Sequence, residues 1–199
     1  CRPVPDNGSP KVIGQLGQSL DGRIATVTGR SRFINGDDGI THLHRIRAVS
    51  DAVVVGAGTA TTDNPRLTVR RTSGRNPVRV VIDRHHRVPE SHHLFTDGEA
   101  PTLRLVAGTY EKAKNPSIGS GVTEIPCLGD AESEDAVDPR VILEVLADLG
   151  LKKVFVEGGG VTVSCFLNAG LLDRLHVMVA PMIIGSGRPA FSLPEIDFL

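Results

Sequence analysis

One candidate anion site follows a short apolar run in the last third of the chain. In residues 154–161, VFVEGGGV, the run stops at a carboxylate, Glu157. Three consecutive glycines come next: Gly158, Gly159 and Gly160. When such a turn leads into a helix, its N–H groups and the positive end of the helix dipole favour phosphate, and glycine lets a pyrophosphate approach closely. A tight turn without a ligand is the alternative that this stretch leaves open.

A second glycine turn has a similar design. Residues 53–60, VVVGAGTA, end an apolar run in Gly56 and Gly58 and then place a hydroxyl at Thr59. Unshielded backbone donors recur there, and two such turns predict a ligand with two phosphates. The motif is not a Rossmann fingerprint, because GAGTAT has no glycine in the third position. The next acid at a strand end, Asp83, also follows Gly56 by 27 residues instead of about 20.

An acid and several arginines could serve a phosphorylated substrate. In residues 61–70, TTDNPRLTVR, Asp-Asn-Pro predicts a turn that brings Asp63 to the end of an element, with Arg66 and Arg70 close by. The planar guanidinium suits bidentate binding of phosphate. A purely turn-forming role for Asp63 stays open. Arg47, at the end of a predicted helix, could join the cluster or stabilise that helix end.

The pair Asp83-Arg84 ends another apolar run, VRVVID, and begins the loop after it. A guanidinium beside an adenosine ribose can bind a 2′-phosphate, which would select NADP over NAD. An ordinary solvated loop pair is the alternative at these two positions.

Other chemistries lack support in the sequence. The adjacent histidines His85-His86 and His92-His93 would point to opposite faces of a strand and have no acidic or thiol partner at ligand spacing, so we predict no metal site. No Gly-x-Ser-x-Gly elbow occurs, and PCLGD lacks the second cysteine of a zinc deaminase. The widely spaced cysteines indicate neither a disulfide framework nor a structural zinc site, which favours a reducing, cytoplasmic setting.

The elements that position these groups are short apolar runs that alternate with helical patterns. Strands are predicted at 12–20, 51–57, 78–83, 102–107 and 153–156, with one more possible at 122–127. The sequence RLHVMVAPMII, at 174–184, predicts a further strand that is buried on both sides. Helices are predicted at 37–49, 139–149 and 161–169. The alternation predicts an α/β fold.

Composition narrows the class of protein. The chain has 199 residues, 40% apolar content and a formal net charge of −1, which predicts one domain over residues 11–199 after a loose lead-in at 1–10. Because there is no global basic field, nucleic acid and membrane surfaces are poor partners and a small molecule fits better. The longest apolar runs are far shorter than the roughly 18 residues of a membrane span.

Several spaced segments agree, in sequence and in order, with one known family. They are QLGQSLDGRIA, SRFI, HRIRAVSDAVVVGAGTATTDNPRLTVR, PVRVVID and VFVEGGG followed by FLNAGLLDRLHVMVAPMIIG. They resemble the RibD C-terminal reductase family of riboflavin biosynthesis. The resemblance implies a dihydrofolate-reductase-like fold with a mixed, mainly parallel sheet flanked by helices. It also implies a homodimer that uses NADPH to reduce 5-amino-6-(5-phosphoribosylamino)uracil to the ribitylamino compound, by hydride transfer to C1′ of the ring-opened imine.

The family's cofactor site maps onto both glycine turns. The resemblance implies that the Gly-x-Gly-Thr turn and the Glu-Gly-Gly turn hold the cofactor, with Ser19 and Asn35 near the nicotinamide. These positions agree with the anion sites expected from the residues alone.

The family's substrate site maps onto the arginines and acids. The resemblance makes Ser31, Arg47 and Arg70 ligands of the substrate's 5-phosphate, and Asp63 and Glu157 would face the reacting sugar. An acid beside that sugar is typically worth 10²–10⁴-fold in rate. The phosphate contacts serve mainly to place C1′ close to the hydride carbon.

The chain departs from the family at two positions. Gln15 stands where those reductases commonly have a lysine before the Ser-Leu-Asp-Gly motif, and Phe33 stands where bacterial members often have tryptophan. Glutamine cannot carry the charge or the proton of lysine. Two alternatives therefore stay open: a dihydrofolate-reductase-like paralogue that reduces another small carbonyl, imine or pterin, and a non-catalytic module that binds NADP.

Overall fold

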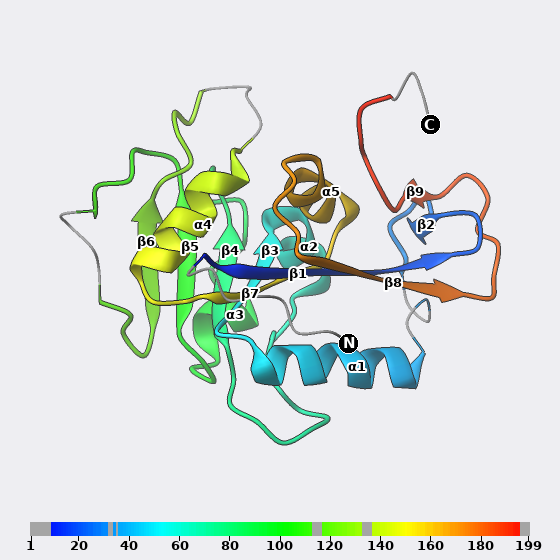
Figure 1. Cartoon of the computed structure of the whole chain (residues 1–199), viewed down its shortest axis with the longest axis horizontal. Coiled ribbons are helices and arrows are strands. Elements are labelled where there is room, and N and C mark those ends of the chain that lie inside the picture. Colours follow the sequence, from blue (N-terminus) through cyan, green and yellow to red (C-terminus); the bar gives the residue numbers. More distant parts are fainter. Residues whose placement is uncertain (1–8, 32–33, 35, 113–116, 133–136, 196–199) are drawn as a thin grey trace.

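A parallel sheet of seven strands forms the centre of the protein (Figure 1). The computed structural model describes residues 9–31, 34, 36–112, 117–132 and 137–195. Within those ranges the strand order is β6-β5-β4-β3-β7-β1-β8, and every neighbouring pair is parallel. The strands are β1 (Lys11–Ser19), β3 (Ala52–Gly56), β4 (Val78–Ile82), β5 (Thr102–Val106), β6 (Val122–Pro126), β7 (Lys153–Glu157) and β8 (Arg174–Ala180). A separate antiparallel pair joins β2 (Arg23–Ala25) and β9 (Arg188–Pro189).

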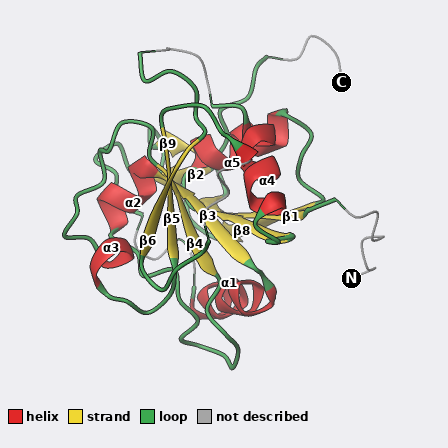
Figure 2. Ribbon diagram, turned by 90° about the vertical axis from the view of Figure 1, so that its left-hand side faces the viewer, coloured by secondary structure: helices red, strands yellow, loops and turns green. Residues whose placement is uncertain are grey.

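Helices cover both faces of the central strands (Figure 2). One face carries α1 (Asp37–Val49), α2 (Ala57–Asp63) and α3 (His93–Thr96), and the other carries α4 (Pro139–Asp148) and α5 (Gly160–Asn168). Val55 and Phe155 pack in the apolar cluster beneath α1, α2 and α3, whereas Val54 and Val156 pack in the cluster beneath α4 and α5. This alternation is the two-residue period of strands that are buried on both sides.

Helix α4 shows how local sequence sets the bounds of an element. Asp138 accepts a hydrogen bond from the N–H of Arg140 as the N-cap, and Pro139 occupies the first turn. Gly150, with a φ of 77°, follows the helix end in the left-handed conformation that glycine adopts most easily. The predicted helix at 139–149 is confirmed.

The other predicted strands and helices are also present, and most of their ends agree closely with the predicted ones. The elements that the sequence did not predict are short: α2, α3, β2 and β9. Such lengths contain too few residues for a hydrophobic period to be recognised. The antiparallel component expected of a mixed sheet appears in the pair β2 and β9 and in an isolated bridge between Gly108 and Gly129, outside the seven-stranded sheet.

The prediction that residues 174–184 form a strand buried on both sides is wrong. β8 ends at Ala180 and lies at the edge of the sheet, where Val177 is 39% and Val179 51% exposed. An apolar run alone cannot distinguish a central strand from an edge strand with an open face.

The described ranges contain no helix that is both long and apolar enough to cross a membrane. The cytoplasmic setting stays a prediction. The division of the chain at residue 10 also stays a prediction, since residues 1–8 lie outside the described part.

The carboxyl ends of the central strands meet at one edge of the sheet. Ser19 ends β1, Gly56 ends β3 and Glu157 ends β7, while Asp83 directly follows β4. Ligands of open parallel sheets bind beyond this edge. The fold therefore gathers there the segments that the sequence predicted to bind a ligand.

Candidate active site

A cavity of about 160 Å³ lies at this edge of the sheet. Its lining comes from β1, α1, α2, the segment after α2, the end of β7 and the turn after it: Gln15, Leu16, Gly17, Leu43, Thr59, Asp63, Pro65, Leu67, Glu157 and Gly158. Both acids that were expected to face the reacting sugar are present, together with one residue from each glycine turn. The structure thus brings the predicted acids and the predicted cofactor turns to one place.

Glu157 is held by Arg47 in a buried ion pair. Arg47 donates from Nε to Oε2 of Glu157 at 2.8 Å, and its Nη2 contacts the other carboxylate oxygen. Its Nη1 donates to the carbonyl oxygen of Thr68 at 3.0 Å. The two charged residues are 5% and 9% exposed, so water competes little with this bidentate contact. Arg47 does not itself line the cavity, and its bonded partners are protein groups.

Asp63 is the last residue of α2, and the turn predicted after it is present. Asn64 caps the helix in the left-handed conformation with a φ of 41°, and its Oδ1 accepts from the N–H of His93 at 2.8 Å. The residue as a whole is exposed, but the protein around the carboxyl displaces water and raises the pKa of Asp63. The cavity therefore holds one carboxyl that burial shifts toward its protonated form and one that is the anion of an ion pair.

Gln15 places a buried amide between neighbouring polar side chains. It pairs in register with Glu157 on one side and His176 on the other, so the three side chains share a face of the sheet. Gln15 is 2% exposed, and within the described structure neither its Oε1 nor its Nε2 has a hydrogen-bond partner. Buried amides are almost always paired, so this one is suited to a ligand in the cavity that it lines.

The two glycine turns touch each other through Thr59. The N–H of Gly159 donates to the Thr59 hydroxyl at 2.9 Å. Gly158 has a φ of 101°, and a Cβ there would lie 2.9 Å from the methyl group of Thr59. Only glycine allows this approach without strain. The turns are adjacent because β3 and β7 are neighbours in the sheet.

Two of the other predicted cofactor glycines have a packing reason. A Cβ at Gly56 would lie 2.5 Å from the hydroxyl of Thr162, and one at Gly160 would lie 2.3 Å from the carbonyl oxygen of Ala190. By contrast, Gly58 is exposed and a Cβ there would meet no atom within 4 Å. The tight-turn alternative thus accounts for Gly56 and Gly160, whereas Gly58 leaves its backbone open to a ligand.

The predicted arginine cluster exists, although it lies beside the cavity. Burial, followed by the charges of Arg47 and Arg66, lowers the pKa of Arg70. Arg66 forms an exposed ion pair with Glu99 at 2.7 Å, and Arg70 donates to the hydroxyl of Thr68 at 2.8 Å. The predicted ligand Ser31 is exposed; Asn35 and Phe33 lie outside the described residues.

Asp83 faces the protein and not a ligand. Its carboxylate is 0% exposed, accepts from the N–H groups of Arg87 and Val88, and pairs with Arg104 at 2.8 Å. This environment corrects the expected cofactor contact, because the oxygens are already bonded within the core. Arg84, which begins the loop that Asp83 anchors, is partly exposed.

Ser19 is likewise committed to the protein. It is 0% exposed; its hydroxyl donates to Asp21 and accepts from the N–H of Arg23 at 3.0 Å. A hydroxyl has one hydrogen to give, so the expected side-chain contact with the nicotinamide is not supported. The Asp21 carboxylate also accepts from the N–H groups of Ile184 and Gly185. With Ser19 as the first cause, these bonds lower the pKa of Asp21 to about 2.

Sequence reasoning did not identify several residues of the site. Leu43 lies within the helix predicted at 37–49, but nothing in the sequence marked Leu43 or Leu67 as a site residue. His44 is buried and accepts from the N–H of Arg70 at 3.1 Å. Burial first, and then the charges of Arg47 and Arg70, lower the pKa of His44 to about 4.

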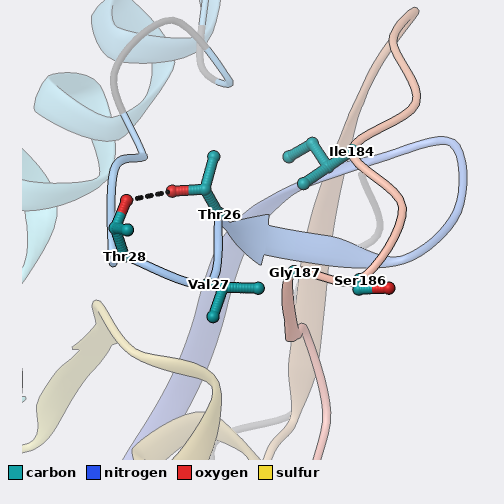
Figure 3. Close-up of a pocket in the computed structure, with 6 residues that line it drawn as sticks. All are labelled: Thr26, Val27, Thr28, Ile184, Ser186 and Gly187. Atoms are coloured by element: carbon teal, nitrogen blue, oxygen red, sulfur yellow. Dashed lines mark hydrogen bonds between the residues drawn. The ribbon is translucent and has the colours of Figure 1, made fainter.

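A second hollow, of about 280 Å³, lies between the turn after β2 and the loop before β9 (Figure 3). It is lined by Thr26, Val27, Thr28, Ile184, Ser186 and Gly187. None of the site residues predicted from the sequence is among them. Its walls carry hydroxyl, aliphatic and backbone groups without a titratable side chain, so the smaller cavity is the better candidate for chemistry.

Comparison with known proteins agrees with this assignment. The family model of the RibD C-terminal domain matches residues 10–198. This chain belongs to that family. Membership makes the protein an oxidoreductase of riboflavin biosynthesis and removes support from the non-catalytic alternative.

Relatives within the RibD C-terminal family differ in length. A 2,5-diamino-6-ribosylamino-4(3H)-pyrimidinone 5′-phosphate reductase from Methanothermobacter thermautotrophicus is 38% identical, over 94% of this chain and 84% of that protein. The riboflavin biosynthesis protein RibD of Bacillus amyloliquefaciens is 35% identical, over 89% of this chain and 47% of that protein. The chain thus spans most of the first relative and about half of the second.

Solved structures also agree with the fold. A diaminohydroxyphosphoribosylaminopyrimidine deaminase/5-amino-6-(5-phosphoribosylamino)uracil reductase from Thermotoga maritima has a TM-score of 0.76 at 29% identity, over 96% of this chain and 51% of that one. The riboflavin biosynthesis reductase Rib7 of Saccharomyces cerevisiae, at 22% identity, has a TM-score of 0.74 over 98% of this chain and 83% of that one. The fold implied by the sequence resemblance is confirmed.

Gln15→Leu removes the unpaired amide and nearly keeps the side-chain volume. Without ligand, we expect the variant to be as stable as the wild type or more stable, by up to ~1–3 kcal/mol, because the buried amide lacks hydrogen bonds. Urea unfolding measures the change in the free energy of unfolding. Gln18→Leu, on the same strand, is the control, for which we expect a change within about 0.5 kcal/mol. A clear loss of stability in Gln15→Leu alone would mean that the amide has a partner in the folded protein.

Proposed function

We propose that the protein is an NADPH-dependent reductase of a ribosylaminopyrimidine 5′-phosphate, with the uracil compound expected from the sequence as its substrate. The observation that carries this proposal is one cavity that joins two acids in different environments, an unpaired buried amide and both glycine turns. The Methanothermobacter relative is named for a diaminopyrimidinone and the Thermotoga relative for the uracil. The reaction at the ribosyl group is common to both names. Parallel assays of NADPH oxidation with the diaminopyrimidinone and the uracil compound show which pyrimidine base the protein prefers.

The chemistry requires a hydride and protons at defined atoms. Ring opening of the ribosylamine places a proton on O4′ and leaves an imine; reduction then adds a hydride at C1′ and a proton at the imine nitrogen. The reduced nicotinamide, when bound, supplies the hydride. The protein has to supply the proton and hold the sugar, and a well-placed acid typically contributes 10²–10⁴-fold.

Asp63 is the proton donor in this proposal. Burial raises its pKa, so more of this carboxyl is protonated near neutral pH than of an ordinary aspartate. Glu157, as the anionic partner of Arg47, offers a fixed negative charge that accepts a hydroxyl of the sugar. Two carboxyls in one site, separated in this way by their surroundings, divide the roles of acid and anion.

The substrate's phosphate is proposed to bind Ser31, Arg66 and Arg70. Burial first, and then the guanidinium groups of Arg47 and Arg66, lower the pKa of Arg70, so positive charges gather around it. A phosphate dianion relieves that repulsion and accepts bidentate hydrogen bonds. Arg47 contributes less to phosphate binding, because its charge is paired with Glu157.

The residues present also fit a dinucleotide phosphate. A Cβ at Gly58 would meet no atom within 4 Å, so the backbone there is open to a ligand, and α5 adds the positive end of its dipole. Arg84 lies next to this place, because Ile82 at the end of β4 pairs with Gly56 at the end of β3. We propose that Arg84 binds the 2′-phosphate that distinguishes NADPH from NADH.

Asp63→Asn removes the proton donor and keeps its shape. We expect kcat to fall by about 10²–10⁴-fold while KM changes little. In the wild type, kcat should rise as the pH falls through the raised pKa of Asp63, because the protonated carboxyl is the active form; the variant should lack this dependence. Steady-state oxidation of NADPH over a pH series measures both effects. The exposed Asp130→Asn serves as control, and wild-type turnover in Asp63→Asn would exclude this role.

Arg84→Leu should weaken the binding of NADPH by about 10- to 100-fold, the value of a hydrogen bond to a charged group. The Kd for NADH should stay unchanged, because NADH lacks the 2′-phosphate. Calorimetric titration with each nucleotide provides the comparison. Arg75→Leu, an exposed arginine paired with Asp51, is the control. An equal loss for both nucleotides would place Arg84 elsewhere in the cofactor site.

We also propose a homodimer that forms through an exposed apolar strip: Leu20, Val177, Val179, Met182 and Ile183. The strip spans the end of β1, the edge strand β8 and the turn after it, and the N–H of Leu20 donates to the carbonyl oxygen of Met182. Edge strands of monomers usually carry charges that prevent pairing, and the sequence from Leu175 to Ile184 contains no Asp, Glu, Lys or Arg.

Val179→Lys places a charge in the strip at an exposed position. We expect light scattering to give a dimeric mass for the wild type and a monomeric mass for the variant, since a buried unpaired charge opposes association. Val161→Lys, at an exposed valine on α5, should remain dimeric. A monomeric wild type would refute the dimer.

A further inference from the structure

Leu67 combines a buried side chain with a backbone conformation that leucine rarely adopts. Its φ is 55°, in the left-handed region, and it is 1% exposed within the apolar cluster shared with α1 and α2. A bulky residue is disfavoured there because its Cβ crowds the following carbonyl oxygen. Strain of this kind persists only where the surroundings hold it, and it collects at functional sites.

Two buried arginines hold the backbone on either side of Leu67. Arg79 donates through Nη1 to the carbonyl oxygen of Arg66 at 3.3 Å. Arg47 donates through Nη1 to the carbonyl oxygen of Thr68 at 3.0 Å. Both guanidinium groups belong to residues that are at most 5% exposed. The peptide group before Leu67 and the one after Thr68 are therefore anchored to the core.

The anchored segment connects both acids of the cavity. Asp63 ends α2 four residues before Leu67, and the guanidinium that binds Thr68 also binds Glu157. The side chain of Leu67 itself lines the cavity with these two acids. A change at Leu67 thus acts on the surroundings of both carboxyls.

We propose that Leu67 is a positioning residue: its left-handed backbone turns a leucine side chain into the cavity wall, where it excludes water from Asp63 and fixes that carboxyl relative to Glu157. Glycine would adopt the same backbone without strain but would leave the wall open. Residues that violate a local backbone preference are found mainly at functional sites, and Leu67 violates one while it lines the cavity. The effect on turnover rests on the proposed function, whereas the effects on stability and on Asp63 do not.

The test compares Leu67→Ala with Leu67→Gly, which both lack the side chain and differ in their tolerance of left-handed backbone. Leu94→Ala is the matched control, because Leu94 is equally buried in the same cluster but does not line the cavity. Leu67→Asn provides a further variant, since asparagine accepts the left-handed conformation and brings a polar group to the wall. NMR titration of the Asp63 carboxyl, urea unfolding and steady-state kinetics are measured for each protein.

We expect the pKa of Asp63 to fall toward its ordinary value in all three Leu67 variants and to stay raised in Leu94→Ala. Leu67→Gly should be more stable than Leu67→Ala, the reverse of the usual order of these residues, because only glycine is free of strain here. kcat should fall by about 10-fold or more through misplacement of the acid, with KM nearly unchanged. The proposal would be overturned if the pKa of Asp63 stayed as high as in the wild type in every folded Leu67 variant. It would also be overturned if Leu67→Ala were more stable than Leu67→Gly. If the wild type fails to reduce the substrate, the titration and unfolding results still decide it.

Discussion

The site depends on the buried contact between Arg47 and Glu157. Taking both charges out of water is costly, and removal of one partner from such a pair typically destabilises a protein by about 3–5 kcal/mol, because the other charge is left uncompensated. The same guanidinium binds the backbone at Thr68. One side chain thus joins α1, β7 and the segment after α2, which are three walls of the cavity.

This arrangement gives two carboxyls in one cavity different chemical properties. Glu157 has a bidentate cation, whereas Asp63 is partly desolvated and has no ion partner among the contacts described for it. Gln15 fits the same logic, since it pairs in register with Glu157. A lysine at this position would put a second cation beside the acid that Arg47 already neutralises. A neutral amide leaves the ion pair undisturbed and keeps hydrogen-bonding capacity for a ligand.

Much of the fold was accessible from the sequence because the central strands are short apolar runs between turn residues, and α4 carries its cap, proline and terminal glycine in order. The acids of the site were accessible because each ends an element. The ion pair between Arg47 and Glu157 was not accessible, since 110 positions separate the two residues and only the packing of α1 on β7 brings them together. Similarly, a glycine required by packing, such as Gly160 against Ala190, looks the same in sequence as one that approaches a ligand. The left-handed backbone of Leu67 has no local signature at all.

The position of β1 between β7 and β8 has a consequence for how the polypeptide matures. β1 is made before either neighbour, because β7 follows only at Lys153–Glu157 and β8 only at Arg174–Ala180. Contacts between such distant segments form slowly, because a long loop has to close before they are gained. The pairing of Gln15 with Glu157 therefore waits for β7, and completion of the sheet waits for β8.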